Sequence, residues 1–245
     1  MAKLSPISKA FIALVALAGA AVVANALLHW QPVELPGFAA LLIISLAASR
    51  LRVKLPGFTG AMSVNLPFIL LAVATMTAAA SLIVGCFSAL VQCLPRNGKN
   101  FNVVRTLFNV SNMALAVGVT QMIYGSAALE TLVESRSMLL AIATVGYMLV
   151  NTMPVAIVLR LTEGQSALRT WAGMLQLSFP YYVAGAGIAG VVMTIGAQVG
   201  WVAPLAVLPL MLGIFHSYRR YFSDEVAGQP ESGAKRPAAS VQAAS

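Results

Sequence analysis

The sequence predicts an all-α integral membrane protein with about six full transmembrane helices, a split or re-entrant central segment and a short surface β-hairpin. Of its 245 residues, 59% are hydrophobic and only 9% are charged, whereas about 25% of residues are charged in soluble domains. The mean hydropathy is +0.86. Apolar runs of the length needed to cross a hydrocarbon core of about 30 Å alternate with short loops, and the basic residues lie in these loops.

The net charge of +8 follows from this arrangement. The basic residues stand singly or in threes between apolar runs, and no basic helix face with interleaved aromatic residues is present. A nucleic-acid partner is therefore not expected. Loops rich in Lys and Arg prefer the cytoplasm, so the lipid bilayer accounts for the charge as well as for the hydrophobicity.

The first predicted helix covers Phe11 to Leu28 and follows a short basic start. Together with the small residues at positions 24–26, this pattern also resembles a secretory signal with its cleavage site. The long apolar stretch and the membrane segments that follow it favour a retained helix. Small residues recur on it every four positions and form a face for close packing, within the chain or with a partner helix. These helix-packing candidates are Ala16, Ala20 and Ala24.

A second, shorter apolar helix is predicted from Pro36 to Ser49. After it, basic and apolar residues alternate from Arg50 to Leu55, and alternation resumes after the turn residues Pro56 to Gly60. A period of two is typical of a half-buried strand. The stretch therefore predicts a short β-hairpin at the membrane surface.

The central run from Leu66 to Leu94 contains no charged residue. It is about 29 residues long, and as one helix it would reach about 43 Å, against a hydrocarbon core of about 30 Å. Thr75 and Thr77 lie near its middle and predict a division into two shorter helices, either re-entrant or thinly spanning. Basic residues flank the run on both sides, so both ends are expected in the cytoplasm. These residues are Arg50, Arg52, Lys54, Arg96, Lys99 and Arg105.

The remaining predicted spans are Val103–Tyr124, Met138–Leu159 (interrupted by Asn151 and Pro154), Trp171–Val199 and Trp201–Phe215. The acidic loop from Gly125 to Ser137 is expected outside. With both termini cytoplasmic, this arrangement places all of the 15 Lys and Arg residues except Arg136 inside. Residues 1–222 are thus expected to form one polytopic membrane domain, and residues 223–245 a disordered cytoplasmic tail that is poor in large apolar residues.

Side-chain amides at membrane depth require hydrogen-bond partners. Ordinary hydrogen bonding between helices accounts for them, and contact with a ligand is the alternative. Irregular backbone inside a membrane is tolerated only beside protein or a polar cavity, so amides near the broken segment are the best candidates to line such a cavity. The ligand-lining candidates are Asn65, Asn109, Asn112 and Asn151.

Catalytic and cofactor motifs are absent from the sequence. The glutamates before residue 200 fall in predicted loops, and no metal-ligand spacing, phosphate-binding loop or nucleophile elbow occurs. Cys86 and Cys93 share a helix face but lie about 10 Å apart along the axis, beyond disulfide reach, and are predicted to be small buried thiols. We therefore expect no enzyme activity, no metal and no cofactor.

Several stretches resemble, in their order along the chain, the membrane module that precedes HD-GYP or GGDEF domains in bacterial signalling proteins. They are LPGFTGAMSVNLP, RTLFNVSN, YMLVNTMPVAIVLRLTEG, FPYY and YRRYF. The resemblance covers about Arg50 to Phe222 and implies a non-catalytic sensory or anchoring module of the bacterial cytoplasmic (inner) membrane. Such a module would bind a small or lipophilic ligand or a partner helix. Neither His29 nor His216 adjoins an aspartate, so the module is expected to be free-standing and to act on a separate signalling protein.

More distantly, the chain resembles the substrate-binding subunit of energy-coupling-factor vitamin transporters. That resemblance implies a solute-uptake function with a transporter partner that docks on the alanine-rich first helix. The central run lacks the Gly-Pro step expected of such subunits. A structural membrane protein without a ligand is the third alternative.

Overall fold

The computed structural model describes residues 5–54, 61–95, 101–164 and 166–199, together with residues 207, 209, 212, 213, 216, 217 and 220. These residues form eight α-helices and two short β-strands. The helices are α1 (Pro6–Leu28), α2 (Leu35–Arg50), α3 (Leu66–Thr75), α4 (Ala78–Cys93), α5 (Val103–Tyr124), α6 (Ala127–Leu132), α7 (Arg136–Glu163) and α8 (Ala167–Val199). The strands are β1 (Arg52–Lys54) and β2 (Ala61–Ser63).

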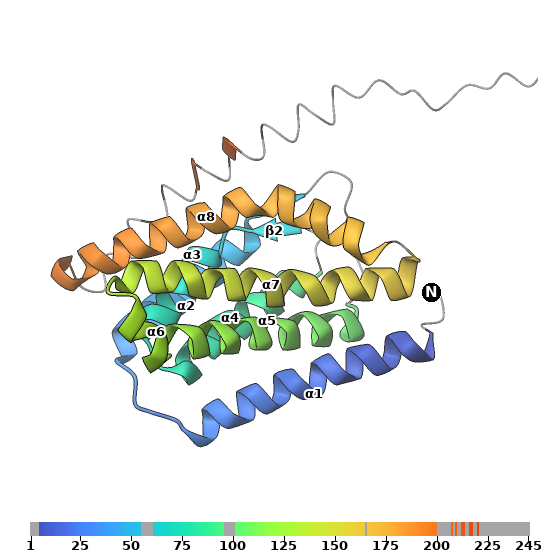
Figure 1. Cartoon of the computed structure of the whole chain (residues 1–245), viewed down its shortest axis with the longest axis horizontal. Helices are drawn as coiled ribbons and strands as arrows, with labels where there is room; N and C mark the ends of the chain where they lie inside the picture. Colours follow the sequence, from blue (N-terminus) through green and yellow to red (C-terminus); the bar gives the residue numbers. More distant parts are fainter. Residues whose placement is uncertain are drawn as a thin grey trace, which may run out of the picture.

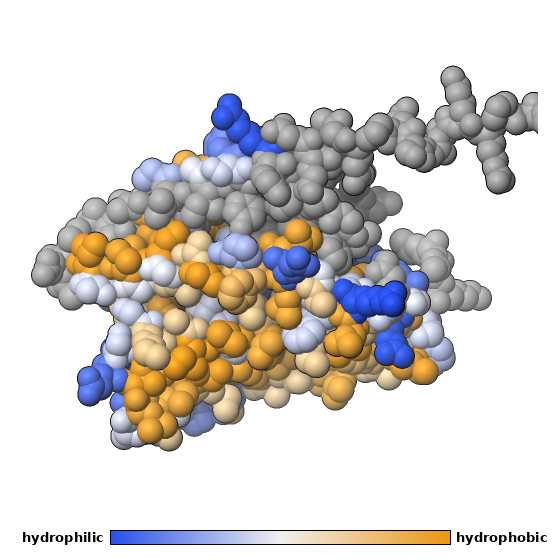
Figure 2. All heavy atoms as spheres, turned by 45° about the horizontal axis from the view of Figure 1, so that its top comes forward, coloured by the Kyte–Doolittle hydropathy of each residue, from blue (hydrophilic) through white to orange (hydrophobic). Residues whose placement is uncertain are grey.

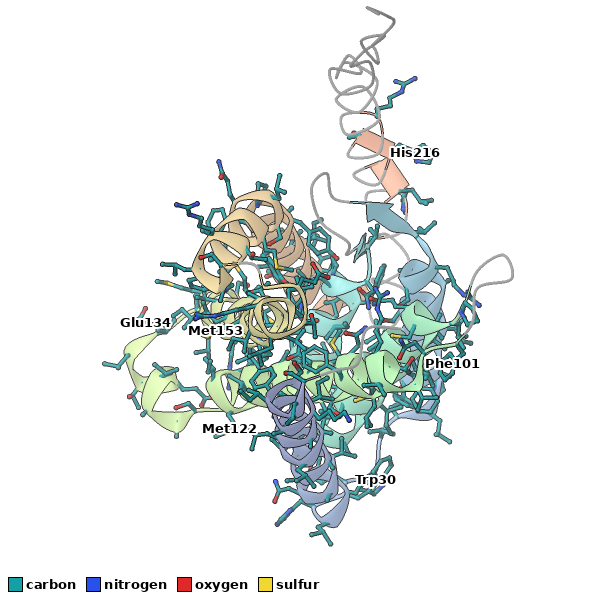
Figure 3. All side chains as sticks on the ribbon, turned by 90° about the vertical axis from the view of Figure 1, so that its right-hand side faces the viewer. Trp30, Phe101, Met122, Glu134, Met153 and His216 are labelled. Atoms are coloured by element: carbon teal, nitrogen blue, oxygen red, sulfur yellow. The ribbon has the colours of Figure 1, made fainter. Side chains whose placement is uncertain are left out.

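The long helices lie side by side along one direction (Figure 1). α7 lies between α5 and α8, α1 packs on α5, and α4 lies between α2 and α5. α3 is the centre of the core, since every residue from Leu66 to Val73 is buried. Viewed along the bundle, α1 stands at one edge, and Trp30 lies just beyond its C-terminal end (Figure 3).

Four helices are long and apolar enough to cross a membrane in the described part of the chain, namely α1, α5, α7 and α8. The expectation of about six full spans is therefore wrong for these residues. α2 has 16 residues, which corresponds to about 24 Å and falls short of a core of about 30 Å. The expected span at 201–215 and the expected tail at 223–245 lie largely or wholly outside the described residues.

The surface agrees with a membrane environment. On the face shown in Figure 2, apolar residues cover the flank of the bundle between hydrophilic groups at its two ends. Large apolar side chains such as Leu17, Met122 and Val191 are more than half exposed on this kind of surface. In water such exposure would be costly, whereas lipid solvates these side chains.

The central run is divided, as predicted. α3 ends at Thr75, and Thr77 caps α4 by accepting the N–H of Ala80 at 3.3 Å. The Gln121 side chain of α5 holds the break from both sides, because its Nε2 donates to the Val73 carbonyl at 3.3 Å and to Ser81 Oγ at 2.7 Å.

The segment also folds back on itself. The break lies beside Gln121, near the end of α5, whereas Cys93 at the end of α4 lies beside Asn109 near the start of α5. The start of α3 lies beside the middle of α8, where the Leu66 N–H donates to the Tyr181 hydroxyl at 3.0 Å. Both ends of the segment therefore lie on the same side of its break, which is the geometry of a re-entrant segment.

The two predicted strands are present and pair antiparallel, with Arg52 opposite Ser63 and Lys54 opposite Ala61. Each has three residues, fewer than the alternating pattern indicated. The connecting residues 55–60 lie outside the described part. Figure 1 shows β2 alongside the middle of the bundle and not at its end, in agreement with the hydrogen bond between Leu66, at the start of the neighbouring α3, and Tyr181, near the middle of α8.

α1 packs on α5 through a different face from the one expected. Ala20 and Ala24 are exposed and Ala16 is only half-buried, so this alanine face packs little within the chain. Gly19 makes the close approach instead, because a Cβ at this position would lie 2.7 Å from the Ser111 carbonyl oxygen. Hydropathy alone did not distinguish these two faces, because small apolar residues occur on both.

We predict that Gly19→Ala destabilises the bundle, because the added methyl group must push α1 away from the α5 backbone. Overpacking of this kind costs about 1–3 kcal/mol. The matched control is Gly37→Ala in α2, where a Cβ meets nothing within 4 Å. Free energies of unfolding from SDS titration in micelles would show the difference; equal stability of the two variants would contradict the close approach.

We also predict that Gln121→Leu weakens the fold at the α3–α4 break, since the Val73 carbonyl and the Ser81 hydroxyl lose their shared donor. Hydrogen bonds between membrane helices average about 0.6 kcal/mol each, so a loss of about 1 kcal/mol is expected in the same titration. Gln176→Leu on the exposed face of α8 is the control and should leave stability nearly unchanged. A Gln121 variant as stable as the control would show that the bridge contributes nothing.

Candidate functional site

Three interruptions of regular backbone hydrogen bonding occur near the middle of the bundle. α3 begins there, α7 contains Pro154 and α8 contains Pro180. α7 and α8 continue as helices through their prolines, so the predicted span from Met138 to Leu159 lies within one helix despite Pro154. A proline has no N–H to offer the carbonyl four residues earlier, so Val150 and Gln176 lose their helical donors. Each of the three elements carries a polar side chain close to its interruption.

The backbone N–H groups at the start of α3 all have hydrogen-bond acceptors, although this end of the helix is buried. The first N–H groups of a helix have no partner within the helix. Here the Leu66 N–H donates to the Tyr181 hydroxyl at 3.0 Å, Pro67 has no N–H, and the next two N–H groups donate to the Asn65 carbonyl at 3.1 and 3.2 Å. Tyr181 of α8 thus supplies the cap that α3 lacks locally.

Hydrogen bonds connect α5, α7 and α8 at this level. Asn112 Nδ2 donates to the backbone carbonyl of Asn151 at 3.0 Å, and Asn151 Nδ2 donates to the Tyr182 hydroxyl oxygen at 3.0 Å. Tyr147 donates its hydroxyl to Met113 Sδ at 3.1 Å. We call this group the polar core, with the members Asn112, Asn151, Tyr147, Tyr181 and Tyr182.

The tyrosine rings hold the polar core together. The ring centroids of Tyr147 and Tyr182 lie 6.1 Å apart, and those of Tyr181 and Tyr182 lie 5.9 Å apart in an edge-on arrangement. Aromatic pairs at these distances stabilise each other by about 0.5–1.5 kcal/mol beyond the area they bury. All three rings are buried, so their hydroxyl groups are fixed within the protein.

Two hydrogen-bonding capacities of the polar core remain open among the described residues. Asn112 is 2% exposed, and its Oδ1 has no donor within hydrogen-bond distance. Tyr182 accepts from Asn151, and its own hydroxyl hydrogen meets no acceptor. A buried polar atom without a partner costs about 1–3 kcal/mol, so the site gains free energy from a water molecule or a ligand group that fills it.

The four predicted ligand-lining asparagines are only partly brought together. The Asn112 side chain donates to the backbone carbonyl of Asn151. Asn65 immediately precedes α3, whose first N–H group donates to the Tyr181 hydroxyl. Asn109 lies apart, because its Nδ2 donates to Cys93 Sγ of α4 at 3.3 Å. Cys86 and Cys93 are free thiols, and both are half-buried.

The tyrosines of the polar core were not among the site residues predicted from the sequence. Tyr181 and Tyr182 directly follow Pro180, and Tyr147 precedes Asn151 by one helical turn. A tyrosine inside a membrane needs a partner for its hydroxyl, as an asparagine does for its amide. This requirement could have indicated from the sequence that the tyrosines are hydrogen-bonded in the same site as the asparagines.

A groove lies beside the polar core, between α7 and α8, with a volume of about 520 Å³. Its lining is mostly apolar and includes Tyr182 and Met148 at the end near the middle of the helices. No charged residue is among the residues that line it. They are Ser137, Ala141, Thr144, Val145, Met148, Phe179, Tyr182, Val183, Ala186, Gly187, Gly190, Val191 and Thr194.

The described residues contain no group of three or more His, Cys, Asp or Glu side chains that could hold a metal ion. The single ion pair between described residues joins Arg136 to Glu130 at 2.6 Å, beside α6 and away from the polar core. Short α6 occupies part of the expected acidic loop, where the sequence suggested no helix.

A comparison with protein families finds that the MASE9 family model matches residues 3–217 of the chain. No curated protein and no solved structure matches it. The matched range includes every element of the polar core and the groove.

We predict a specific pattern of energetic coupling in the polar core. Asn151→Leu and Tyr182→Phe should couple by about 0.6 kcal/mol, and by no more than about 1.7, as found for hydrogen bonds between membrane helices. Asn112→Leu and Asn151→Leu should couple less, because Asn112 donates to the backbone of Asn151, which leucine retains. Double-mutant cycles on unfolding free energies test this; the reverse order of couplings would contradict the assigned bonds.

Proposed function

Because the chain belongs to the MASE9 family of membrane-associated sensory domains, we propose that it is a non-catalytic sensory module of the bacterial cytoplasmic membrane. In this proposal a small or lipophilic ligand is recognised at the polar core. The observation that carries the proposal is the open Oδ1 of Asn112 in a fully buried position between α5, α7 and α8. A network with a purely structural role would be more stable if a protein group donated a hydrogen bond to this oxygen.

The two prolines are positions at which α7 and α8 could change direction when a ligand binds. Three residues of the polar core, Asn151 in α7 and Tyr181 and Tyr182 in α8, lie within three positions of Pro154 or Pro180, where the helices lack a backbone hydrogen bond. A ligand that binds one packing of these helices more tightly than another shifts the population towards it. Occupation of the polar core would thereby change the direction of the helix ends beyond the prolines.

The charge distribution supports a cytoplasmic output. Ser8 near the start of α1 donates to the Leu161 carbonyl near the end of α7 at 3.0 Å, so these two ends lie together. Lys9, Arg160 and Arg169 lie at or near this end of the bundle, and Glu130 and Glu134 lie by α6 at the other end. The positive-inside rule assigns the first end to the cytoplasm, where a separate signalling protein would receive the change.

Solute uptake is the second candidate function. The exposed Ala20 and Ala24 of α1 and the buried, broken α3 favour it, since an uptake subunit needs a docking face and an interior binding segment. The same two features are compatible with a sensory module that docks on a partner helix.

The experiment compares Asn112→Leu with Asn109→Leu, both in α5. Each tagged full-length variant is purified from its native membranes in polymer nanodiscs, and retained small molecules are identified by mass spectrometry. We expect the wild type and Asn109→Leu to retain a molecule that Asn112→Leu loses, because only Asn112 carries the open acceptor. Equal retention in both variants would contradict a ligand at the polar core.

Partner recovery separates the two functions. After crosslinking from the cytoplasmic side, a signalling enzyme should co-purify with a sensory module. Recovery of an ATPase together with a transmembrane coupling subunit would contradict the sensory proposal and favour uptake.

A further inference from the structure

We propose that the groove between α7 and α8 is a lateral binding site for an uncharged lipophilic molecule that carries a carbonyl oxygen, with Tyr182 as its hydrogen-bond donor. The proposal deepens the proposed function and rests on it, because it assigns the chemical class of the ligand and its route to the polar core. It follows from the charge, the hydrogen bonds and the opening of the groove.

The lining determines the charge of the occupant. A charged group inside the groove would find no opposite charge among the residues that line it, and an unpaired charge within a membrane is expensive. Head groups of charged lipids are therefore excluded from the groove itself. A volume of about 520 Å³ lies within the range of about 300–1,000 Å³ that is usual for small-molecule sites.

The hydroxyl groups of the groove are already committed as donors, with one exception. Thr144 donates to the Leu140 carbonyl at 2.7 Å, and Thr194 and Ser137 both donate to the Gly190 carbonyl, at 2.9 and 3.4 Å. Tyr182 alone accepts a hydrogen bond without donating one to a described residue. An occupant can thus satisfy the groove by presenting an acceptor oxygen to Tyr182.

Tyr182 is more than nine-tenths buried, so bulk water competes little for its hydroxyl hydrogen. Its position is fixed by Asn151 on one side and by the rings of Tyr147 and Tyr181 on the other. A carbonyl oxygen that accepts from Tyr182 would join the same hydrogen-bond chain that runs through Asn151 to Asn112. Binding in the groove would therefore act directly on the polar core.

The groove opens towards the flank of the bundle. Val145, Phe179, Val183 and Val191 line it and are each more than half exposed. These residues belong to the apolar surface that lipid would cover, so the entry lies within the membrane and not at its aqueous face. Gly187 adds no side chain that would narrow the groove, and a Cβ at this position would meet nothing within 4 Å.

The test uses two photoactivatable probes of equal chain length, a diazirine-bearing long-chain ketone and the corresponding hydrocarbon. The full-length protein is reconstituted in phosphatidylcholine nanodiscs, and the labelled residues are mapped by mass spectrometry. We expect the ketone to label groove residues such as Phe179 and Val183, and to do so in competition with unlabelled ketone.

Gly187→Leu should place its side chain in the groove, since a Cβ there meets nothing within 4 Å, and should lower labelling by both probes at least about tenfold. Gly37→Leu in α2 is the matched control, because its Cβ also meets nothing within 4 Å, and it should leave labelling unchanged. Tyr182→Phe keeps the ring but removes the donor, so ketone labelling should fall about three- to tenfold, as for one neutral hydrogen bond. Labelling by the hydrocarbon should stay the same, whereas a general distortion of the groove would lower both.

Labelling that is insensitive to Gly187→Leu would overturn the groove as the site. An equal effect of Tyr182→Phe on both probes would overturn the role of its hydroxyl. Either failure, together with retention of a small molecule that still depends on Asn112, would leave the sensory proposal standing, because that readout does not involve the groove. Loss of the Asn112 dependence with intact groove labelling would overturn the proposed function instead.

Discussion

The fold depends on the requirement that every backbone polar group inside a membrane be satisfied by the protein itself. The strongest demand is at the start of α3, where a helix begins in the middle of the bundle with all its first residues buried. Its first four residues carry three N–H groups, because Pro67 has none, and the Tyr181 hydroxyl and the Asn65 carbonyl accept all three. Without the Tyr181 hydroxyl, the Leu66 N–H would be unpaired at a depth where no solvent can replace it.

The same requirement brings α5, α7 and α8 together. The prolines of α7 and α8 remove backbone hydrogen bonds, and the side chains of the polar core join the three helices beside these interruptions. The network is well connected but incomplete, because Asn112 Oδ1 and the Tyr182 hydroxyl hydrogen remain available. Hydrogen bonding between the helices thus explains why these residues are polar. The donor and the acceptor that remain without partners favour a ligand at this site.

Much of the architecture could be predicted from hydropathy and charge, because both depend on the order of residues along the chain. The bounds of α5 agree with the predicted span, and the division of the central run was predicted from its length and from Thr75 and Thr77. The face by which α1 packs was not, because Gly19 and the alanines are equally apolar and only the position of Ser111 distinguishes them. Asn109 and Asn112 share a helix, yet three positions of helical rotation send one to α4 and the other to α7.

The fold-back of residues 66–93 is the central claim, and the compartments of its flanks test it most directly. In a chain whose Cys86 and Cys93 are replaced by serine, single cysteines are placed at Arg50, Phe101 and Ser126 and treated with a membrane-impermeant maleimide from either side. We predict that positions 50 and 101 react from one side and position 126 from the other. Reaction of positions 50 and 101 from opposite sides would mean that the segment crosses the membrane once, and would contradict the account.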